Sequence, residues 1–293
     1  MKILITGGSG KIGSRITRDL LEKNHEVHYT YCNNKLNVGI EHKLDISDRH
    51  NTINLISKIQ PNFVIHTAAL TNVDLCETDK KLANLLNING TENILEGCKK
   101  IQSNIIYIST SFVFDGKKEK YYEDDKPNPI NNYGFTKLRG EQLVKNSKLP
   151  YIILRTDQPY SWKEKWQINN SVLRVIDHLQ QGKIMKEVDN WFNVPTYTPD
   201  LVRVIEHMIN HKLLGTYHAS GSNFISRYEW ALAIAEIFKL DKKLIIPIKS
   251  ESLNLPAKRP NVNLSNGKIF EDTGIKMNGI IEGLKYMQKI QHE

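Results

Sequence analysis

The sequence predicts an α/β protein in which a doubly wound parallel sheet carries a smaller C-terminal lobe. Three observations support this fold class. In the first half, short apolar runs alternate with helical patterns, which is typical of consecutive βαβ units. A glycine-rich turn joins the first apolar run to the first helix. After Arg155 the alternation weakens, and prolines and aromatic residues gather in 156–166 and 191–199. We therefore expect a sheet domain at 1–155 and a second lobe mainly at 156–293, with about 185–212 returning to the sheet domain.

The elements follow in order along the chain. Strands are expected near 2–6, 26–31, 40–44, 62–67, 104–109 and 151–155, and helices near 11–23, 49–59, 79–100, 133–147, 167–181 and 199–211. Asp48 and Asp79 stand where a side-chain oxygen can accept from the free N–H groups of a helix start. Ser226-Arg227-Tyr228-Glu229 matches the S-x-x-E capping box, so we expect a helix from there to Phe238.

Composition narrows the class of protein. The 293 residues carry a formal net charge of +8, but lysines are mixed with acidic residues and form no basic block, so we expect no nucleic-acid partner. Cys32, Cys76 and Cys98 are widely spaced, which predicts reduced thiols and no metal site. No apolar run approaches the ~20 residues of a membrane helix. Because the first strand begins at Lys2, we expect no signal peptide and a cytoplasmic protein.

The loop at 7–13 carries two glycine spacings at once. Residues 8–13 read G-x-G-x-x-G, and Gly7, Gly10 and Gly13 give G-x-x-G-x-x-G. A helix N-terminus offers free N–H groups to a pyrophosphate, and residues without a Cβ allow it to approach closely. Because the motif follows a strand and opens a helix, it predicts dinucleotide binding on a Rossmann-type sheet, with Lys11 and Ile12 in the same site. An ordinary tight turn is the alternative.

The end of the second strand bears on which dinucleotide binds. It reads Tyr31-Cys32-Asn33-Asn34-Lys35 and lacks the acidic residue that would bind the ribose hydroxyl of NAD. Asn33 and Lys35 would suit the extra phosphate of NADP, so NADP(H) is favoured and NAD(H) stays open. A solvated Lys35 is the alternative. Asp45-Ile46 follows the third strand and is expected near the adenine amino group, unless Asp45 caps a helix.

Tyr133 and Lys137 stand four residues apart, hence on one face of a helix. A nearby positive charge favours a phenolate, so we expect Lys137 to lower the pKa of Tyr133 from about 10. Such a tyrosine can protonate the oxygen of a ketone that receives a hydride. Thr110 ends the fifth strand, at the carboxyl edge where open α/β sheets bind ligands, and would orient the carbonyl. Ser109 is the rival for that role.

With these residues, the chain resembles the extended short-chain dehydrogenase/reductase superfamily, and within it the dTDP-4-dehydrorhamnose reductase family. The resemblance covers nearly the whole chain. It rests on the glycine loop, His66-Thr67-Ala68-Ala69 with Thr71, Val73 and Asp74, and on 86–91, 108–116, 133–141, Val194-Pro195-Thr196, Asp200-Leu201 and 257–260.

The resemblance implies NADPH-dependent reduction of the 4-keto group of a nucleotide-activated 6-deoxy sugar. It implies that Thr110, Tyr133 and Lys137 are catalytic and that Asn87 supports their proton relay. The second lobe would bind the nucleotide-sugar. The remaining implied residues are Thr67, Ala68 and Ala69 for the cofactor and Val73, Phe112 and Arg259 for the substrate.

Two departures leave the sugar open. Family members commonly read Ser-Thr-Asp-Tyr where this chain has Ser109-Thr110-Ser111-Phe112. The segment 160–166 also differs, and its Trp162 is either a substrate contact or part of a surface lid packed by its own aromatics.

Other functions remain open. A sugar-nucleotide epimerase or dehydratase of the same superfamily is one alternative, although no second acid/base pair is evident beside Thr110. A non-catalytic regulatory subunit, similar to the beta subunit of methionine adenosyltransferase, is another. A homodimer stays open. His66 ends a buried strand and is expected to be a core or cofactor-adjacent residue, since no metal-type cluster accompanies it.

Overall fold

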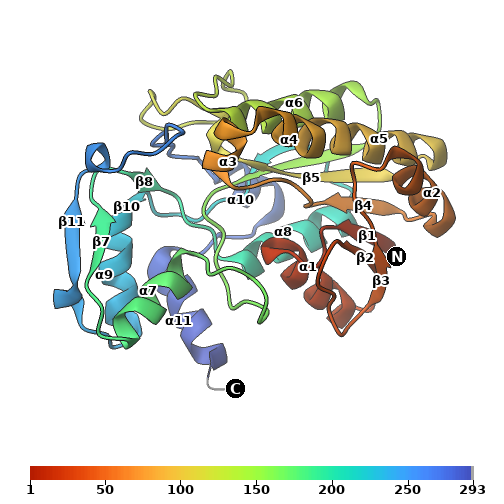
Figure 1. The fold of residues 1–293 in the computed structure, drawn as a ribbon. Helices are drawn as coiled ribbons and strands as arrows, with labels where there is room; N and C mark the ends of the chain where they lie inside the picture. The colour runs from red at the N-terminus through yellow and green to blue at the C-terminus, as the bar shows by residue number, and fades with distance from the viewer. Residues whose placement is uncertain (292–293) are drawn as a thin grey trace.

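A seven-stranded parallel sheet forms the centre of the computed structural model, which describes residues 1–291 (Figure 1). Its order is β3-β2-β1-β4-β5-β6-β9. Strands are added outward on one side of β1 as far as β3 and then on its other side from β4 onward, so the order of the strands reverses between β1 and β4. A sheet of this kind binds ligands at the carboxyl ends of its strands. The strands are β1 (Lys2–Thr6), β2 (Glu26–Tyr31), β3 (Ile40–Lys43), β4 (Phe63–His66), β5 (Asn104–Thr110), β6 (Tyr151–Thr156) and β9 (Gly215–His218).

Helices cover both faces of this sheet, as the ribbon in Figure 1 shows. On one face α1 packs against α8, and buried Leu20, Leu201 and Met208 join the apolar side chains of the strands. On the other face α5 packs against α2 and α6, and Ile94 and Val144 fill the core. The helices are α1 (Lys11–Glu22), α8 (Thr198–His211) and α10 (Gly267–Thr273) on the first face, and α2 (Arg49–Ile59), α5 (Gly90–Ile101) and α6 (Asn132–Asn146) on the second.

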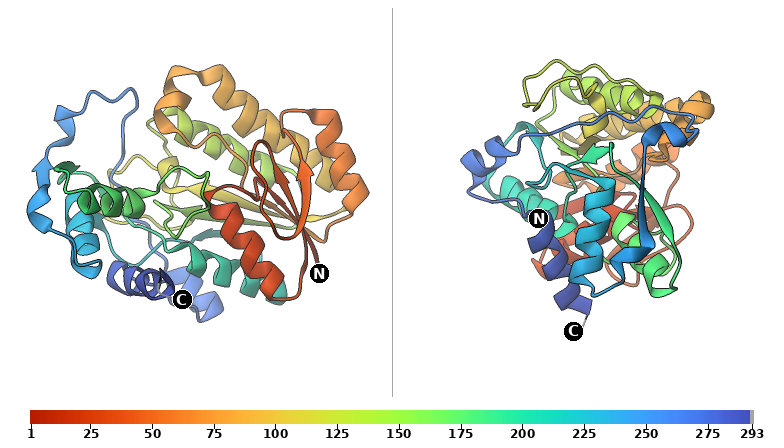
Figure 2. Two further views of the ribbon diagram at one scale, coloured as in Figure 1. Left: turned by 60° about the horizontal axis from the view of Figure 1, so that its bottom comes forward. Right: turned by 90° about the vertical axis from the view of Figure 1, so that its left-hand side faces the viewer.

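A smaller group of elements lies beside the sheet and has its own core (Figure 2). Two short sheets belong to it, one pairing β7 (Met185–Val188) with β11 (Ile245–Ile248) in parallel, the other pairing β8 (Phe192–Asn193) with β10 (Ile225–Ser226) antiparallel. Its helices are α7 (Ser171–Gln180), α9 (Arg227–Ile237) and α11 (Ile280–Gln291). The chain passes back through α8 and β9, which belong to the central sheet and its helical layer, before it returns to this group.

The predicted fold class is confirmed, and most predicted elements occur within a few residues of their expected bounds. The predicted caps are also present. Asp48 accepts from Asn51 N at 3.0 Å, and Asp79 accepts from Leu82 N at 2.9 Å. Ser226 and Glu229 form the reciprocal capping box at the start of α9.

Two predicted helices differ from the observed ones. The helix expected at 79–100 is divided into α4 (Lys80–Asn84), a π-helical turn (Leu85–Asn89) and α5. The wider turn accommodates Asn87, whose side chain points inward and bonds the backbone of Leu70. The helix expected at 167–181 begins only at Ser171, because Asn170 caps it by accepting from Leu173 N at 3.1 Å.

The three cysteines are free. Within residues 1–291 no helix is long and apolar enough to cross a membrane. In the same described part of the chain, no group of three or more His, Cys, Asp or Glu side chains is arranged to hold a metal ion.

Candidate active site

One cavity of about 820 Å³ opens at the carboxyl ends of the strands. The glycine loop after β1 forms one end, and Thr110, Tyr133 and Asp157 line the other. We call these the dinucleotide end and the substrate end. The cavity thus lies at the edge of the sheet that the strand order predicts.

The glycines at the dinucleotide end are required by geometry. Gly7 has φ +66°, in the left-handed region that favours glycine. A Cβ on Gly13 would lie 2.3 Å from the carbonyl oxygen of Gly7, which no side chain can do. Gly10 is the N-cap of α1 and supplies no side-chain cap. The first N–H groups of α1 are therefore available to an anion, which the positive end of the helix dipole favours.

Most of the predicted cofactor residues line the cavity. They are Gly7, Gly10, Lys11, Ile12, Gly13, Asn33, Asp45, Ile46, Thr67, Ala68 and Ala69. Lys35 does not line it; its exposed ammonium forms an ion pair with Glu41 at 2.6 Å. Asp45 accepts from Ser47 N and Ser47 Oγ, while Asp48 caps α2. Asp48, and not Asp45, is thus the residue that caps this helix.

Tyr133 and Lys137 project from the first turns of α6, whose start is fixed by Asn131 accepting from Gly134 N at 2.8 Å. Thr110 ends β5 and lies beside Tyr133, and its hydroxyl lowers the pKa of Tyr133 by hydrogen bonding. Burial nevertheless dominates and raises the pKa of Tyr133 above its ordinary value. The pKa of Tyr133 is therefore raised where the sequence predicted a lowering, since the loss of hydration outweighs the interactions that favour the phenolate.

Lys137 is itself strongly affected by burial. Its side chain is buried, with Nζ 4.1 Å from the centroid of the Tyr107 ring. Burial lowers the pKa of Lys137 to about 7, and the charge of Glu141 opposes this shift. Gly140 makes the arrangement possible, because a Cβ there would lie 2.0 Å from the Tyr107 hydroxyl oxygen.

A buried ion pair joins α6 to β6. Glu141 and Arg155 join through Arg155 Nη2 at 2.8 Å and Nε at 2.9 Å, and both side chains are almost fully buried. Ser109 Oγ donates to Glu141 at 2.6 Å. The rival hydroxyl of Ser109 is therefore engaged in holding Glu141, whereas Thr110 lies beside Tyr133.

Asn87 and His66 lie behind the cavity wall. Asn87 accepts from Leu70 N at 2.7 Å and donates to Thr136 Oγ1 at 3.0 Å, next to Lys137 in the chain. It therefore positions the loop after β4 against α6. His66 bonds Thr6 and Thr91 inside the core, and burial lowers its pKa to about 3, so it is a neutral core residue.

The substrate end contains some of the predicted residues and not others. Val73 and Phe112 line the cavity. Trp162 does not, because its indole Nε1 donates to Met287 O at 2.7 Å and its ring packs on Phe238. Arg259 also lies outside the lining and forms an ion pair with Asp74 at 2.8 Å.

Sequence reasoning missed many of the residues that line the cavity, among them Asp157, Gln158 and Trp166. Asp157 directly follows β6, so its place at the carboxyl edge of the sheet was a usable signal. Trp166 lies four residues from Trp162 in an irregular segment, and no pattern distinguished the two tryptophans.

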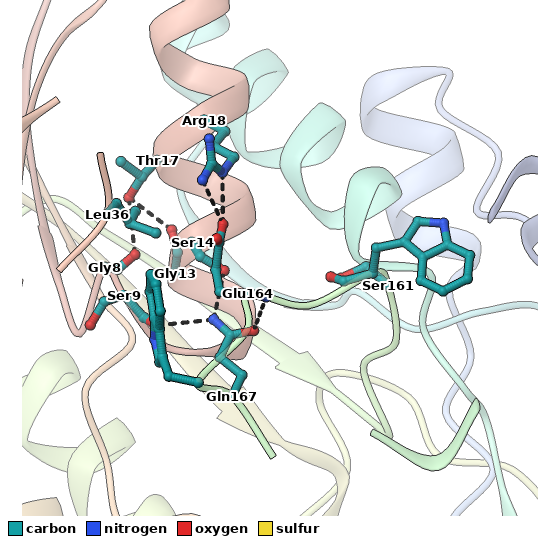
Figure 3. Close-up of polar contacts among 12 residues, drawn as sticks. Gly8, Ser9, Gly13, Ser14, Thr17, Arg18, Leu36, Ser161, Glu164 and Gln167 are labelled. Atoms are coloured by element: carbon teal, nitrogen blue, oxygen red, sulfur yellow. Dashed lines mark hydrogen bonds and ion pairs between the residues drawn. The ribbon is translucent and has the colours of Figure 1, made fainter. Parts of the chain in front are cut away.

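Residues 161–170, which we call the strap, run from the smaller lobe across the glycine loop (Figure 3). Arg18 binds Glu164 through Nη2 at 2.7 Å and Nε at 2.8 Å. Gln167 Nε2 donates to Ser9 O and to Ser14 Oγ, both at 3.0 Å, and Figure 3 shows these contacts on one side of α1. The strap therefore closes one wall of the dinucleotide end.

The parallel sheet with this strand order, the glycine loop and the Thr110, Tyr133 and Lys137 set define an oxidoreductase of the short-chain dehydrogenase/reductase class. Residues 1–291 match the family described as RmlD substrate binding domain, and the chain belongs to this family.

Relatives of known identity agree with this membership. A dTDP-4-dehydrorhamnose reductase from Clostridium acetobutylicum is 33% identical, with a TM-score of 0.88 over 100% of both chains. The dTDP-4-dehydrorhamnose reductase of Bacillus anthracis str. Ames, solved in complex with NADP, is 29% identical, with a TM-score of 0.89 over 99% of this chain and 100% of that one. Methionine adenosyltransferase 2 subunit beta of Rattus norvegicus is 31% identical over 94% of this chain and 83% of its own.

Proposed function

We propose that the protein reduces the 4-keto group of a nucleotide-linked 6-deoxy sugar with NADPH. The observation that carries the proposal is that Thr110, Tyr133 and Lys137 line the same cavity as the glycine loop. The sugar nucleotide would bind mainly against the second lobe, residues 156–293. The identity of this chain with two dTDP-4-dehydrorhamnose reductases supports the choice of substrate class.

The dinucleotide end fits a nicotinamide dinucleotide. Backbone N–H groups at the start of α1 would hold its pyrophosphate, and Gly13 leaves the space that a Cβ would fill. Asp45 and Ile46 would lie by the adenine. A reduced nicotinamide, when bound, supplies the hydride.

Fewer observations bear on the choice between NADPH and NADH. Asn33 and Asp45 both line the cavity. Lys35 is held by Glu41, so Asn33 and the backbone around it are the better candidates for the ribose phosphate. The NADP complex of the Bacillus anthracis relative supports NADPH.

The catalytic groups of this chain would act on the carbonyl oxygen. Negative charge develops there during reduction, and a positioned acid must neutralise it. Burial raises the pKa of Tyr133, so its phenol stays protonated near neutrality and can donate that proton. Thr110 would bind the same oxygen and orient it. The Lys137 ammonium, four residues further along α6, would stabilise the phenolate that remains.

The proposal is tested by mixing the purified protein with NADPH and a panel of dTDP-4-keto-6-deoxyhexoses. We expect a sugar-dependent decrease in the absorbance of the reduced nicotinamide. The absence of any such decrease across the panel would contradict the proposal.

A second function has one specific observation in its favour. The 31% identity with a methionine adenosyltransferase subunit covers nearly the whole chain. In a regulatory role the dinucleotide would stabilise a partner-binding shape. Stable copurification with a synthetase, together with an unchanged effect on that synthetase after Tyr133→Phe, would favour this function over the reductase.

A further inference from the structure

Tyr107 is a buried side chain that the proposed reduction does not use, and its ring contacts Lys137. It belongs to β5, where side chains alternate between the two faces of the sheet, so Tyr107 and Ser109 both face α6. Lys137 Nζ lies over the Tyr107 ring, 4.1 Å from its centroid, and Tyr107 is 0% exposed. A ring face attracts a cation within about 6 Å of its centroid, so the two side chains interact directly.

The Tyr107 ring is held in this position from the helix and from the sheet. Its hydroxyl donates to Lys137 O at 3.4 Å, and a Cβ on Gly140 would lie 2.0 Å from that hydroxyl oxygen. The ring of His66 on β4 packs against it, with the two centroids 5.6 Å apart. Because protein interiors are close-packed, the ring cannot turn away from Lys137 without displacing one of these neighbours.

The Lys137 ammonium has no acceptor of its own in the part of the chain that the structure describes. No hydrogen bond from Nζ is found there, and only burial and through-space charges act on its pKa. Glu141 favours the ammonium through space, but its oxygens are bound by Arg155 and Ser109. The Tyr107 ring is therefore a direct contact that stabilises the charge.

The other groups around Lys137 are mostly uncharged. The titratable groups that face it are Cys76 on α3 (Val73–Thr78), His66 on β4, Tyr107 on β5, and Tyr133 and Glu141 one turn away on α6. Burial raises the pKa of Cys76 to about 11 and lowers the pKa of His66 to about 3, so both are neutral near pH 7. Burial also raises the pKa of both tyrosines.

An aromatic face stabilises an ammonium without using its hydrogen-bond donors. A lysine carries three N–H donors and no acceptor, and a carboxylate in the place of Tyr107 would occupy one or two of them. Lys137 lines the cavity together with Tyr133. With the ring beneath it, the ammonium keeps both its charge and its donors for the groups in the cavity.

We propose that Tyr107 is a positioning residue of the reductase, whose ring face stabilises the charged ammonium of Lys137 and leaves its N–H donors free toward the cavity. The proposal rests on the proposed function, because the charge of Lys137 matters for turnover only if Tyr133 is the acid. Tyr107 itself lies outside the cavity lining and acts through Lys137.

A second pair of this kind provides a matched control. Lys268 Nζ lies over the ring of Tyr217, 4.2 Å from its centroid, and Tyr217 is a buried residue of β9 in the same sheet. Lys268 is partly exposed, donates to Thr216 O at 2.9 Å, and lies outside the cavity lining, as does Tyr217. Tyr217→Leu therefore removes a comparable buried ring and leaves Lys137 unaffected.

The first test is the pH dependence of kcat/KM for the nucleotide-linked keto-sugar that is reduced fastest with NADPH. In Tyr107→Leu the ammonium of Lys137 loses its ring contact and its proton at lower pH. We expect the fall in kcat/KM toward alkaline pH to begin about one pH unit earlier than in the wild type. The rate at pH 7 then drops about fivefold, while the rates at pH 5 agree within about twofold.

The conservative variant separates the ring from the hydroxyl. Tyr107→Phe keeps the aromatic face and loses only the bond to Lys137 O, so its profile should lie within about 0.3 pH unit of the wild type. Tyr217→Leu should lower stability without moving the profile. Where Tyr107→Leu does not fold, phenylalanines with one, two and three ring fluorines at position 107 weaken the negative ring face step by step, and the fall should move to lower pH in the same order.

The second test does not depend on activity. In protein labelled with ¹³C-lysine, the Cε resonance of Lys137 is identified by its absence in Lys137→Arg and followed with pH. We expect a midpoint near 7 in the wild type and in Tyr107→Phe, and a midpoint about one unit lower in Tyr107→Leu.

A midpoint that is unchanged or raised in Tyr107→Leu, or one that moves as far in Tyr107→Phe, would overturn the role of Tyr107 and leave the proposed function standing. If no sugar is reduced by any of the proteins, the proposed function fails. The resonance midpoints then still decide whether Tyr107 stabilises the charge of Lys137.

Discussion

The dinucleotide end of the cavity is built mainly from glycines and the free backbone N–H groups of one helix start. The substrate end is built from side chains that separate segments contribute, namely Thr110 at the end of β5, Tyr133 and Lys137 on α6, and Asp157 after β6. Backbone groups bind any pyrophosphate, whereas side chains can be exchanged one at a time. The first end is thus suited to a constant ligand and the second to a variable one.

The two ends also differ in how their charges are balanced. At the dinucleotide end the helix dipole and the Lys11 ammonium both favour binding of a negatively charged ligand. At the substrate end Lys137 and Asp157 are both buried, and burial shifts the pKa of each toward its neutral form. Substitutions at the dinucleotide end should therefore change the affinity for the dinucleotide. Substitutions at the substrate end should change turnover and substrate specificity.

Tyr133→Phe is expected to give the largest difference between the effect on turnover and the effect on cofactor binding. The phenol hydroxyl is removed without changing the shape of the ring, so the developing oxyanion loses its proton donor. We expect turnover to fall about a thousandfold, within the range of positioned acid catalysts. NADPH affinity, measured by fluorescence titration, should stay within about twofold. A variant that retains turnover would show that Tyr133 is not the acid.

The features that could be predicted from the sequence are local ones. The glycine loop, the Asp48 cap and the Tyr133 to Lys137 spacing each lie within a few residues, so a pattern reports them directly. The substrate end depends on strand register, since Thr110 and Asp157 lie close together only because Thr110 pairs with Thr156.

Tertiary contacts also decided the residues that sequence reasoning placed less well. Trp162 packs into the smaller lobe while Trp166 reaches the cavity, although both stand in the same strap. Lys35 could reach a phosphate or a carboxylate, and the position of Glu41 on β3 settles the contact. No local pattern encodes either outcome.

Gly13→Ala should weaken binding of the dinucleotide without altering the substrate end. The new Cβ would lie 2.3 Å from Gly7 O and 2.8 Å from Gly8 Cα, so the loop must shift and its N–H groups lose their alignment. We expect the dissociation constant of NADPH, measured calorimetrically, to rise about a hundredfold. Gly267→Ala is the matched control, because its nearest neighbour would be 3.6 Å away. Similar losses in both variants would rule out a specific role for the loop.

The pH profile should show the charge of Lys137. Its pKa of about 7 lies below the ordinary 10.5 because of burial, so the ammonium loses its proton as the pH rises through 7. We expect kcat/KM to fall about tenfold for each pH unit above this value. Lys137→Arg keeps a permanent charge and should abolish the fall. Between pH 7 and 10.5 the unfolded chain binds this proton more tightly, so the free energy of unfolding rises with pH there.

The smallest effect is expected from the strap, and it concerns exchange of the dinucleotide. Glu164→Gln removes the ion pair with Arg18, whose side chain is 41% exposed, so the pair contributes only about 0.2–1 kcal/mol. NADPH should therefore dissociate roughly one and a half to five times faster in stopped-flow measurements, with turnover chemistry unchanged. Glu96→Gln removes a comparable exposed pair with Arg49, between α2 and α5, and should leave the dissociation rate unaltered. Equal rates in all three proteins would mean that the strap covers the cavity without retaining its ligand.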